Sequence, residues 1–258
     1  MIRALWTAAS GMSAQQLNVD TISNNLANVN TTGFKRQRVD YQDLFYQTLR
    51  EPGTEEGSPN GLEVGTGTYP VSTQKIFTGG ALQVTETPLD MAIEGDGFFQ
   101  VALTDGSIGY TRSGTFRLDS DGRIVTADGY ALQPEITVPS GTQEIVVNPS
   151  GTVSVRGSGG GAPTEIGTIE LASFSNPAGL RSLGHSLYAE SPAAGSPVTG
   201  QGGLDGMGQV RQGMLEQSNV SVVDEMVGMI TAQRAYELSA KAIQTADDMI
   251  RISNNLRG

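Results

Sequence analysis

Residues 3–30 of the chain read RALWTAASGMSAQQLNVDTISNNLANVN. Two sets of mainly apolar side chains recur here every seven residues, the second set three places after the first: Leu5, Met12, Val19 and Leu26, and then Ala8, Gln15, Ile22 and Val29. This spacing is typical of a helix that packs along its length against another helix. Only Arg3 and Asp20 are charged between residues 1 and 34, so we expect this helix to be enclosed on several sides.

The same spacing returns near the other end of the chain. Large side chains recur every seven residues at Val222, Met229, Tyr236, Ile243 and Ile250, and small ones follow the last four at Ala232, Ser239, Ala246 and Ser253. A row of polar residues is expected on the opposite face of this helix: Glu237, Lys241, Gln244, Asp248, Arg251 and Asn255. A helix of about 30 residues is roughly 45 Å long. We therefore expect each apolar stripe to pack against the other terminal helix or against another copy of the chain.

The sequence between the two stripes is rich in glycine and alternates with a period of two. Short strands are predicted at 98–101, 115–118 and 152–155, among others, and Asp-Gly pairs such as Asp121-Gly122 predict turns between them. Together with the two helices this predicts an α+β protein, with a coiled-coil-like helical part and a central, mainly antiparallel β domain.

Domain boundaries follow from these changes of pattern. A helical core domain is predicted at 1–38 with 216–258, an extended segment at 39–70, and a β-rich outer domain at 71–215. Gly33 is expected to end the first helix, and 39–49 is expected to be a short helical or mixed piece. The acidic stretch 50–70 is too rich in glycine and proline for regular helix.

Composition excludes several classes of function. The net charge of −11 argues against nucleic-acid binding, and the basic cluster Lys35, Arg36 and Arg38 is interpreted as cations at a helix C-terminus. The absence of cysteine excludes disulfides and thiol chemistry, and no apolar run is long enough to predict a membrane-embedded protein. A cleavable signal peptide is not expected, because the seven-residue spacing continues unbroken past residue 14.

No constellation for catalysis, cofactor binding or metal binding is predicted. The loop at 117–128 resembles a calcium loop, but Arg117 stands where the first acid is needed, so a turn is favoured. Glu94 and Asp96 flank a glycine without any sign that they converge on a substrate, and His185 is the only histidine of the chain.

Three separated motifs resemble the bacterial flagellar axial proteins, the rod and hook family. They are SNNLANVNTTGFK at 23–35, GDGFF at 95–99 with YTRSGTF at 110–116, and the stretch from Asn219 to Glu237 that contains AQRAYE. The resemblance covers nearly the whole chain. The chain length and the stretch 50–70 resemble the distal-rod members of the family, with a proximal-rod or hook paralogue as the alternative.

The resemblance implies a structural subunit without enzymatic activity or cofactors. It implies a homo-oligomer that assembles helically into a rigid hollow driveshaft, which transmits torque to the hook and contains the export channel. The implied partners are proximal rod proteins, the hook protein, the surrounding basal-body rings, the type III export apparatus and a rod cap. The implied location is the rod that crosses the periplasm. The alternative from another class is a secreted β-rich binding module or enzyme with oligomerising helices.

Site roles are also implied by the resemblance. The self-assembly helices carry Leu5, Met12, Val19, Ile22, Leu26, Val29, Val222, Met229, Tyr236, Ile243 and Ile250. The polar row (Glu237, Lys241, Gln244, Asp248, Arg251 and Asn255) is the candidate lining of the channel. The candidate rod-stiffening segment carries Glu51, Pro52, Pro59, Gly61, Leu62, Val64, Gly65 and Gly67.

Overall fold

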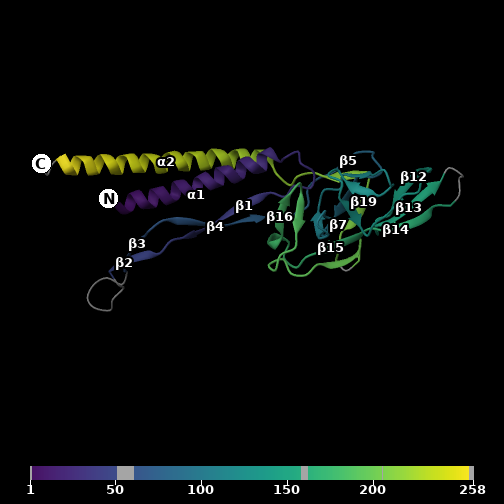
Figure 1. Ribbon diagram of the computed structural model, residues 1–258. Helices are drawn as coiled ribbons and strands as arrows, with labels where there is room; N and C mark the ends of the chain where they lie inside the picture. The colour runs from purple at the N-terminus through teal and green to yellow at the C-terminus, as the bar shows by residue number, and fades with distance from the viewer. Residues whose placement is uncertain (1, 51–60, 158–161, 205, 256–258) are drawn as a thin grey trace. The chain divides into compact units, whose positions relative to one another are not determined.

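Helices and strands separate into two parts of the chain. The computed structural model describes residues 2–50, 61–157, 162–204 and 206–255 (Figure 1). Met1–Ala27, Gln37–Lys75 and Ser221–Gly258 form one unit, called here the helical unit. Asn28–Arg36 and Ile76–Val220 form the other, called the β unit. Long terminal helices with a mainly antiparallel central β region confirm the predicted α+β class.

The helical unit is built on two helices that lie side by side, α1 (Ile2–Ala27) and α2 (Val222–Asn255) (Figure 1). Small residues are among the most deeply buried of the helical unit. Ala14, Ala232 and Ala246 are almost completely buried, and a Cβ placed on Gly11 would lie 3.6 Å from Ser239 Oγ. Small side chains allow two helix backbones to approach closely, so this line of contact leaves many larger side chains at the rim.

The first helix is shorter than predicted. It ends at Ala27 rather than at Gly33, and residues 28–33 form turns. Gly33 has a positive φ of 67°, but its N–H donates to the Glu216 carbonyl at 2.8 Å instead of closing a helix end. The glycine is required there because a Cβ would meet the backbone of Arg112 at 2.6 Å.

A long β-hairpin completes the helical unit. β1 (Gln37–Asp43) pairs antiparallel with β4 (Thr68–Lys75), and β2 (Tyr46–Arg50) pairs with β3 (Leu62–Gly65) further along the hairpin (Figure 1). The prediction of a helical or mixed piece at 39–49 is therefore wrong. Val39 is buried and the Tyr41 hydroxyl donates to the Ala14 carbonyl at 3.2 Å, so alternate residues of β1 face α1.

The β unit contains one large sheet and several smaller ones, all antiparallel. The nine-stranded sheet has the order β16 (Arg181–Gly184), β17 (Leu187–Ala189), β8 (Ile108–Thr111), β7 (Phe98–Ala102), β11 (Ala131–Gln133), β10 (Ile124–Thr126) and β9 (Phe116–Leu118), with β15 (Glu170–Ser173) joining β7 to β18 (Val198–Gln201). The smaller sheets are β12 (Thr142–Val147) with β13 (Thr152–Gly157) and β14 (Thr164–Thr168), β19 (Gln209–Gln212) with β6 (Met91–Glu94), and β20 (Met214–Glu216) with β5 (Leu82–Val84). A 3₁₀ turn, η1 (Pro177–Gly179), lies before β16.

Two apolar clusters form the core of the β unit. Phe99 and Phe116, fully buried in the larger cluster, meet edge to face with ring centroids 5.2 Å apart. The smaller cluster gathers aromatic rings, including Phe98 and Tyr110. Gly106, Gly122 and Gly129 all have positive φ, which confirms the predicted Asp-Gly turns.

A buried ion cluster lies where the β unit's separate chain segments meet. Lys35 Nζ lies 2.6 Å from Glu216 Oε1 and donates to the Thr78 carbonyl at 2.8 Å. The same Glu216 oxygen accepts the Gly80 N–H at 2.8 Å, and Arg112 Nη1 lies 3.4 Å from the other oxygen. Both ends of the Lys35 pair are essentially inaccessible to water. The interpretation of Lys35 as a helix C-terminal cation is therefore wrong.

Backbone oxygens complete the cluster. Arg112 Nη2 donates to the Gly95 carbonyl at 2.8 Å, and its guanidinium carbon lies 5.3 Å from the Phe98 ring centroid. Burial lowers the pKa of the Lys35 ammonium, and the Glu216 carboxylate opposes that shift. One carboxylate thus serves two buried cations, so Glu216 is the member whose loss leaves the most uncompensated charge.

We expect Glu216→Gln to destabilise the β unit by about 3–5 kcal/mol, because Lys35 and Arg112 then remain buried without the carboxylate that pairs with both. Lys35→Met should cost less, since the Arg112–Glu216 pair survives. The free energy of unfolding from urea denaturation, followed by circular dichroism, measures both.

Glu144→Gln is the matched control. Glu144 and Arg156 form an ion pair of 2.9 Å, but both side chains are about half exposed, so we expect a change within about 1 kcal/mol. If Glu216→Gln were as mild as this control, the buried cluster would not hold the segments together.

Candidate assembly surfaces

The predicted self-assembly residues on the two helices are buried to different depths. On α1, Ile22 is buried and Leu5, Met12, Val19 and Leu26 are half-buried, whereas Val29 lies in a turn after the end of α1 and belongs to the β unit. On α2, Met229, Ile243 and Ile250 are half-buried, whereas Val222 and Tyr236 are 40% and 43% exposed. Ala232 and Ala246, at 2% and 3% exposed, are buried more deeply than these large ones. The helix pair therefore leaves much of its large apolar surface in contact with solvent.

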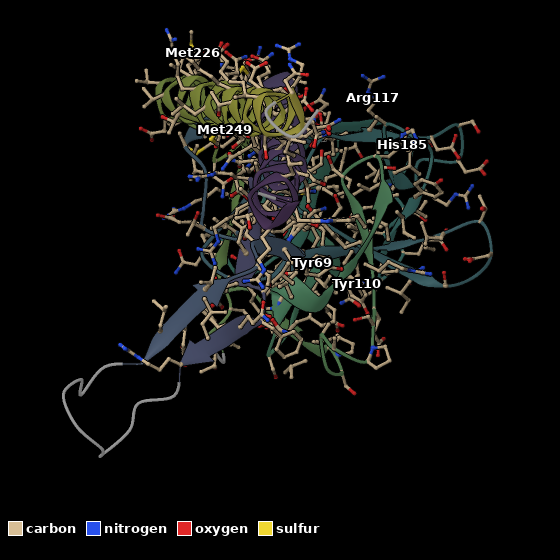
Figure 2. All side chains as sticks on the ribbon, turned by 90° about the vertical axis from the view of Figure 1, so that its left-hand side faces the viewer. Tyr69, Tyr110, Arg117, His185, Met226 and Met249 are labelled. Atoms are coloured by element: carbon tan, nitrogen blue, oxygen red, sulfur yellow. The ribbon has the colours of Figure 1, made fainter. Side chains whose placement is uncertain are left out.

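A second apolar surface of α2 was not predicted. It consists of exposed large side chains, called here the apolar face: Val223, Met226, Val227, Ile230, Leu238, Met249 and Ile252. Figure 2 shows Met226 and Met249 on this helix. The spacing of Val223, Val227 and Ile230 by four and three residues is the sequence signal for such a face. Exposed apolar side chains gathered in this way, most densely over residues 223–230, mark an interaction surface.

The polar row of α2 is exposed at all six positions. Three of its members take part in ion pairs within the helix, Glu237 with Arg234 at 3.4 Å and Asp248 with Arg251 at 2.8 Å. Such exposed pairs contribute little to stability, so they leave the row free to face water. Neither helix, in the residues described, has a stretch long and apolar enough to cross a membrane.

The hairpin carries a further set of exposed apolar residues. They are Phe45, Tyr46, Leu49, Leu62, Tyr69 and Val71, and Tyr69 is labelled in Figure 2. Of the predicted stiffening residues, Glu51, Pro52 and Pro59 lie outside the described residues. Leu62, Val64 and Gly65 belong to β3, directly after Gly61.

Gly67 has a role within its own chain. Its φ is 132°, and a Cβ there would collide with the Ser10 side chain of α1. The N–H of the neighbouring Thr68 donates a hydrogen bond to Ser10 Oγ, with nitrogen and oxygen 3.4 Å apart. The absence of a side chain at Gly67 thus lets the hairpin backbone approach α1.

A buried polar tie joins three segments of the helical unit. Asn25 Nδ2 donates to the Gln37 carbonyl at 2.9 Å and to Glu225 Oε2 at 3.2 Å, and Asn25 Oδ1 accepts the Gln37 N–H at 2.9 Å. Asn25 and Glu225 are 1% and 4% exposed. The tie fixes the end of α1, the start of β1 and the first turn of α2. Asn25 lies in the motif at 23–35, but its partners are 12 and 200 residues away in the sequence, so no local pattern indicates this role.

The acids of the calcium-like loop are paired with an arginine. Arg123 Nη2 lies 3.1 Å from Asp119 and 3.3 Å from Asp121. Hydrogen bonds from Ser120 and Arg123 lower the pKa of the Asp119 carboxyl. His185 is exposed, with its Nδ1 3.4 Å from Asp128. These contacts are those of a polar turn, which agrees with the turn reading of the loop.

Comparison with known families gives three matches along the chain. Residues 5–35 match the family described as flagella basal body rod protein. Residues 92–155 match the D1 domain of the flagellar hook protein FlgE/F/G family, and residues 211–256 match the C-terminal region of the flagellar basal body rod FlgEFG proteins. The matches fall on α1, on the β unit and on α2.

Full-length relatives agree with these matches. The flagellar basal-body rod protein FlgG of Borreliella burgdorferi is 50% identical over 100% of this chain and 99% of its own length. The FlgG proteins of Caulobacter vibrioides and Bacillus subtilis are 45% and 37% identical, over at least 99% of both chains in each comparison. Motif order, fold and full-length identity together show that the chain belongs to the flagellar basal-body rod protein family.

Proposed function

We propose that this chain is a structural subunit of the distal rod, which polymerises helically into a hollow driveshaft and performs no catalysis. The observation that carries the proposal is sequence identity of 50% and 45%, over nearly the full length, to proteins named basal-body rod protein FlgG. A paralogue is less favoured. The chain is 37% identical to FlgG of Bacillus subtilis and 28% identical to the hook-basal body complex protein FlhP of the same organism. Relatives of this kind also disfavour a secreted binding module or enzyme.

The apolar face of α2 supports polymerisation on physical grounds. Burying a side chain such as valine, isoleucine or methionine stabilises a contact by roughly 1.5–3 kcal/mol. These side chains gain little in an isolated chain, where they are exposed. A contact between two different surfaces of identical subunits repeats into an open helix unless it closes into a ring. The self-assembly residues of α1 and α2 are therefore proposed to form subunit contacts in such a helix.

The proposal assigns a role to each domain predicted from the sequence. The helical core domain, 1–38 with 216–258, forms the inner tube, the segment 39–70 reaches between subunits, and the β-rich domain 71–215 forms the outer layer. The proposed partners are proximal rod proteins, the hook protein, the surrounding rings, the type III export apparatus and a rod cap.

The polar row is proposed to line the channel. Its six side chains are exposed in the chain and include carboxylates, cations and amides. Charged groups are costly to bury without partners, so they favour the place in a tube that stays wet. A wall of mixed charge and amides also offers little apolar surface to hold an unfolded chain in transit.

We expect the double substitution Val227→Ser with Ile230→Ser to raise the concentration needed for polymerisation by about 100-fold. Two lost apolar contacts of about 1.5 kcal/mol each correspond to about that factor. Both side chains are more than half exposed in the chain, so the subunit itself should keep its circular dichroism spectrum. Sedimentation over a range of concentrations measures the effect.

Gln244→Ser is the control on the polar row, and it should polymerise like the unmodified chain. Equal critical concentrations for the double variant and this control would contradict a subunit contact at the apolar face.

The hairpin beyond β1 and β4 is proposed to stiffen the polymer by contacting neighbouring subunits. Phe45 is 91% exposed, and Tyr46, Leu49 and Leu62 are each at least half exposed. Leu44 N–H donates to the Gly67 carbonyl at 2.9 Å, which marks where the β1–β4 ladder ends. The part beyond this bond can therefore be removed without breaking the ladder.

Excising residues 46–65, with Phe45→Asn and Thr66→Gly to form a two-residue turn, should leave polymers that bend. An Asn-Gly turn suits a tight hairpin, so the contacts of β1 and β4 with α1 are kept. Persistence length from electron micrographs is the measurement. A Phe45→Ser variant with the full hairpin separates loss of one contact from loss of the whole segment. Polymers of the excised form that are as straight as the original would exclude a stiffening role.

A further inference from the structure

Trp6 is the only tryptophan in the sequence, and its side chain is 72% exposed on α1. An indole combines a large apolar area with one N–H donor, and such residues dominate the energetics of many protein interfaces. In the described part of the chain, Trp6 belongs to neither of the two apolar clusters of the core. Trp6 is therefore a large exposed side chain of the helical unit that can contact another molecule.

A hollow of about 410 Å³ lies between the two helices of the same unit. α1 contributes Gln16 and Val19 to its lining, and α2 contributes Gln233, Tyr236 and Glu237. Val19 and the Tyr236 ring give it apolar walls, while two amides and a carboxylate give it hydrogen-bond acceptors. This combination suits an aromatic side chain that also carries a donor.

The chain's own Trp6 cannot fill the hollow. Gln16 and Val19 follow Trp6 by ten and thirteen residues on one helix, which is roughly 15–20 Å along the axis. An indole side chain is much shorter than that. Any tryptophan in the hollow must therefore come from another molecule.

We propose that the hollow receives Trp6 of a neighbouring copy of this chain, a contact that rests on the homopolymer proposed above. The indole packs against Val19 and Tyr236, and its N–H donates to the side-chain amide oxygen of Gln16. Projection and hollow are different surfaces of one subunit, so the contact repeats from copy to copy. Parallel α1 helices joined in this way are offset along their axis by roughly 15–20 Å.

Other exposed side chains fit the hollow less well. Phe45 is 91% exposed, but it has no donor for the Gln16 amide oxygen. Tyr46 and Tyr69 are 57% and 60% exposed and carry a hydroxyl donor, but their ring is smaller than an indole. Size and donor together favour the indole as the occupant.

The emission of Trp6 tests the contact, because no other tryptophan contributes to the signal. On polymerisation the emission should shift to shorter wavelength and become protected from acrylamide quenching. Val19→Phe, which fills the hollow, should keep Trp6 quenchable in any polymer that still forms. Phe45→Ala is the matched control, and its polymers should protect Trp6 as the unmodified ones do.

Cross-linking gives an independent readout, because the chain has no cysteine of its own. Trp6→Cys and Gln233→Cys chains, mixed, polymerised and treated with a short bis-maleimide, should give a heterodimer. A mixture of Phe45→Cys and Gln233→Cys chains should not. The contact would be overturned, and the homopolymer proposal would stand, if polymers sediment but Trp6 stays quenchable and the Trp6→Cys and Gln233→Cys chains do not cross-link. The failure of the unmodified chain to form any polymer would overturn both.

Discussion

The close approach of α1 and α2 through small residues determines what the rest of the helical unit can do. Ala14, Ala232 and Ala246 fill the contact, with Gly11 opposite Ser239. Backbones that meet so closely leave little room between them for large side chains, which remain at the rim or on the outer faces. The apolar face of α2 is the consequence. The two helices bury small residues against each other, and their large apolar side chains stay exposed and available for contacts with other molecules.

Each unit has a buried polar group that holds its separate chain segments together where they meet. Asn25 joins Gln37 and Glu225 within the helical unit. Lys35 and Arg112 share Glu216 within the β unit. A buried polar group is costly unless its partners are in place, so both groups specify one arrangement of their segments. For a rod subunit, fixed geometry within each unit is a requirement for transmitting torque.

The sequence predicted the elements whose signals are local. The seven-residue stripes located both helices, and Asp-Gly pairs located turns in the β unit. Residues 28–36 and 39–49 were misassigned because distant partners decide their structure: Glu216 binds Lys35, and β4 pairs with β1. The stripe on α2 was also counted with a period of 3.5 residues, whereas a straight helix has 3.6 and drifts by about 20° per seven residues. From Val222 to Ile250 the drift adds up to about 80°, so the five positions do not share one face of the helix.

A density map of the assembled polymer, at a resolution that shows side chains, tests the central claim most directly. The account predicts that Val227, Ile230 and Leu238 of α2 contact neighbouring subunits while Gln244, Asp248 and Arg251 face the bore. A map in which Val227, Ile230 and Leu238 are exposed to the bore, or in which Gln244, Asp248 and Arg251 are buried against protein, would contradict the account.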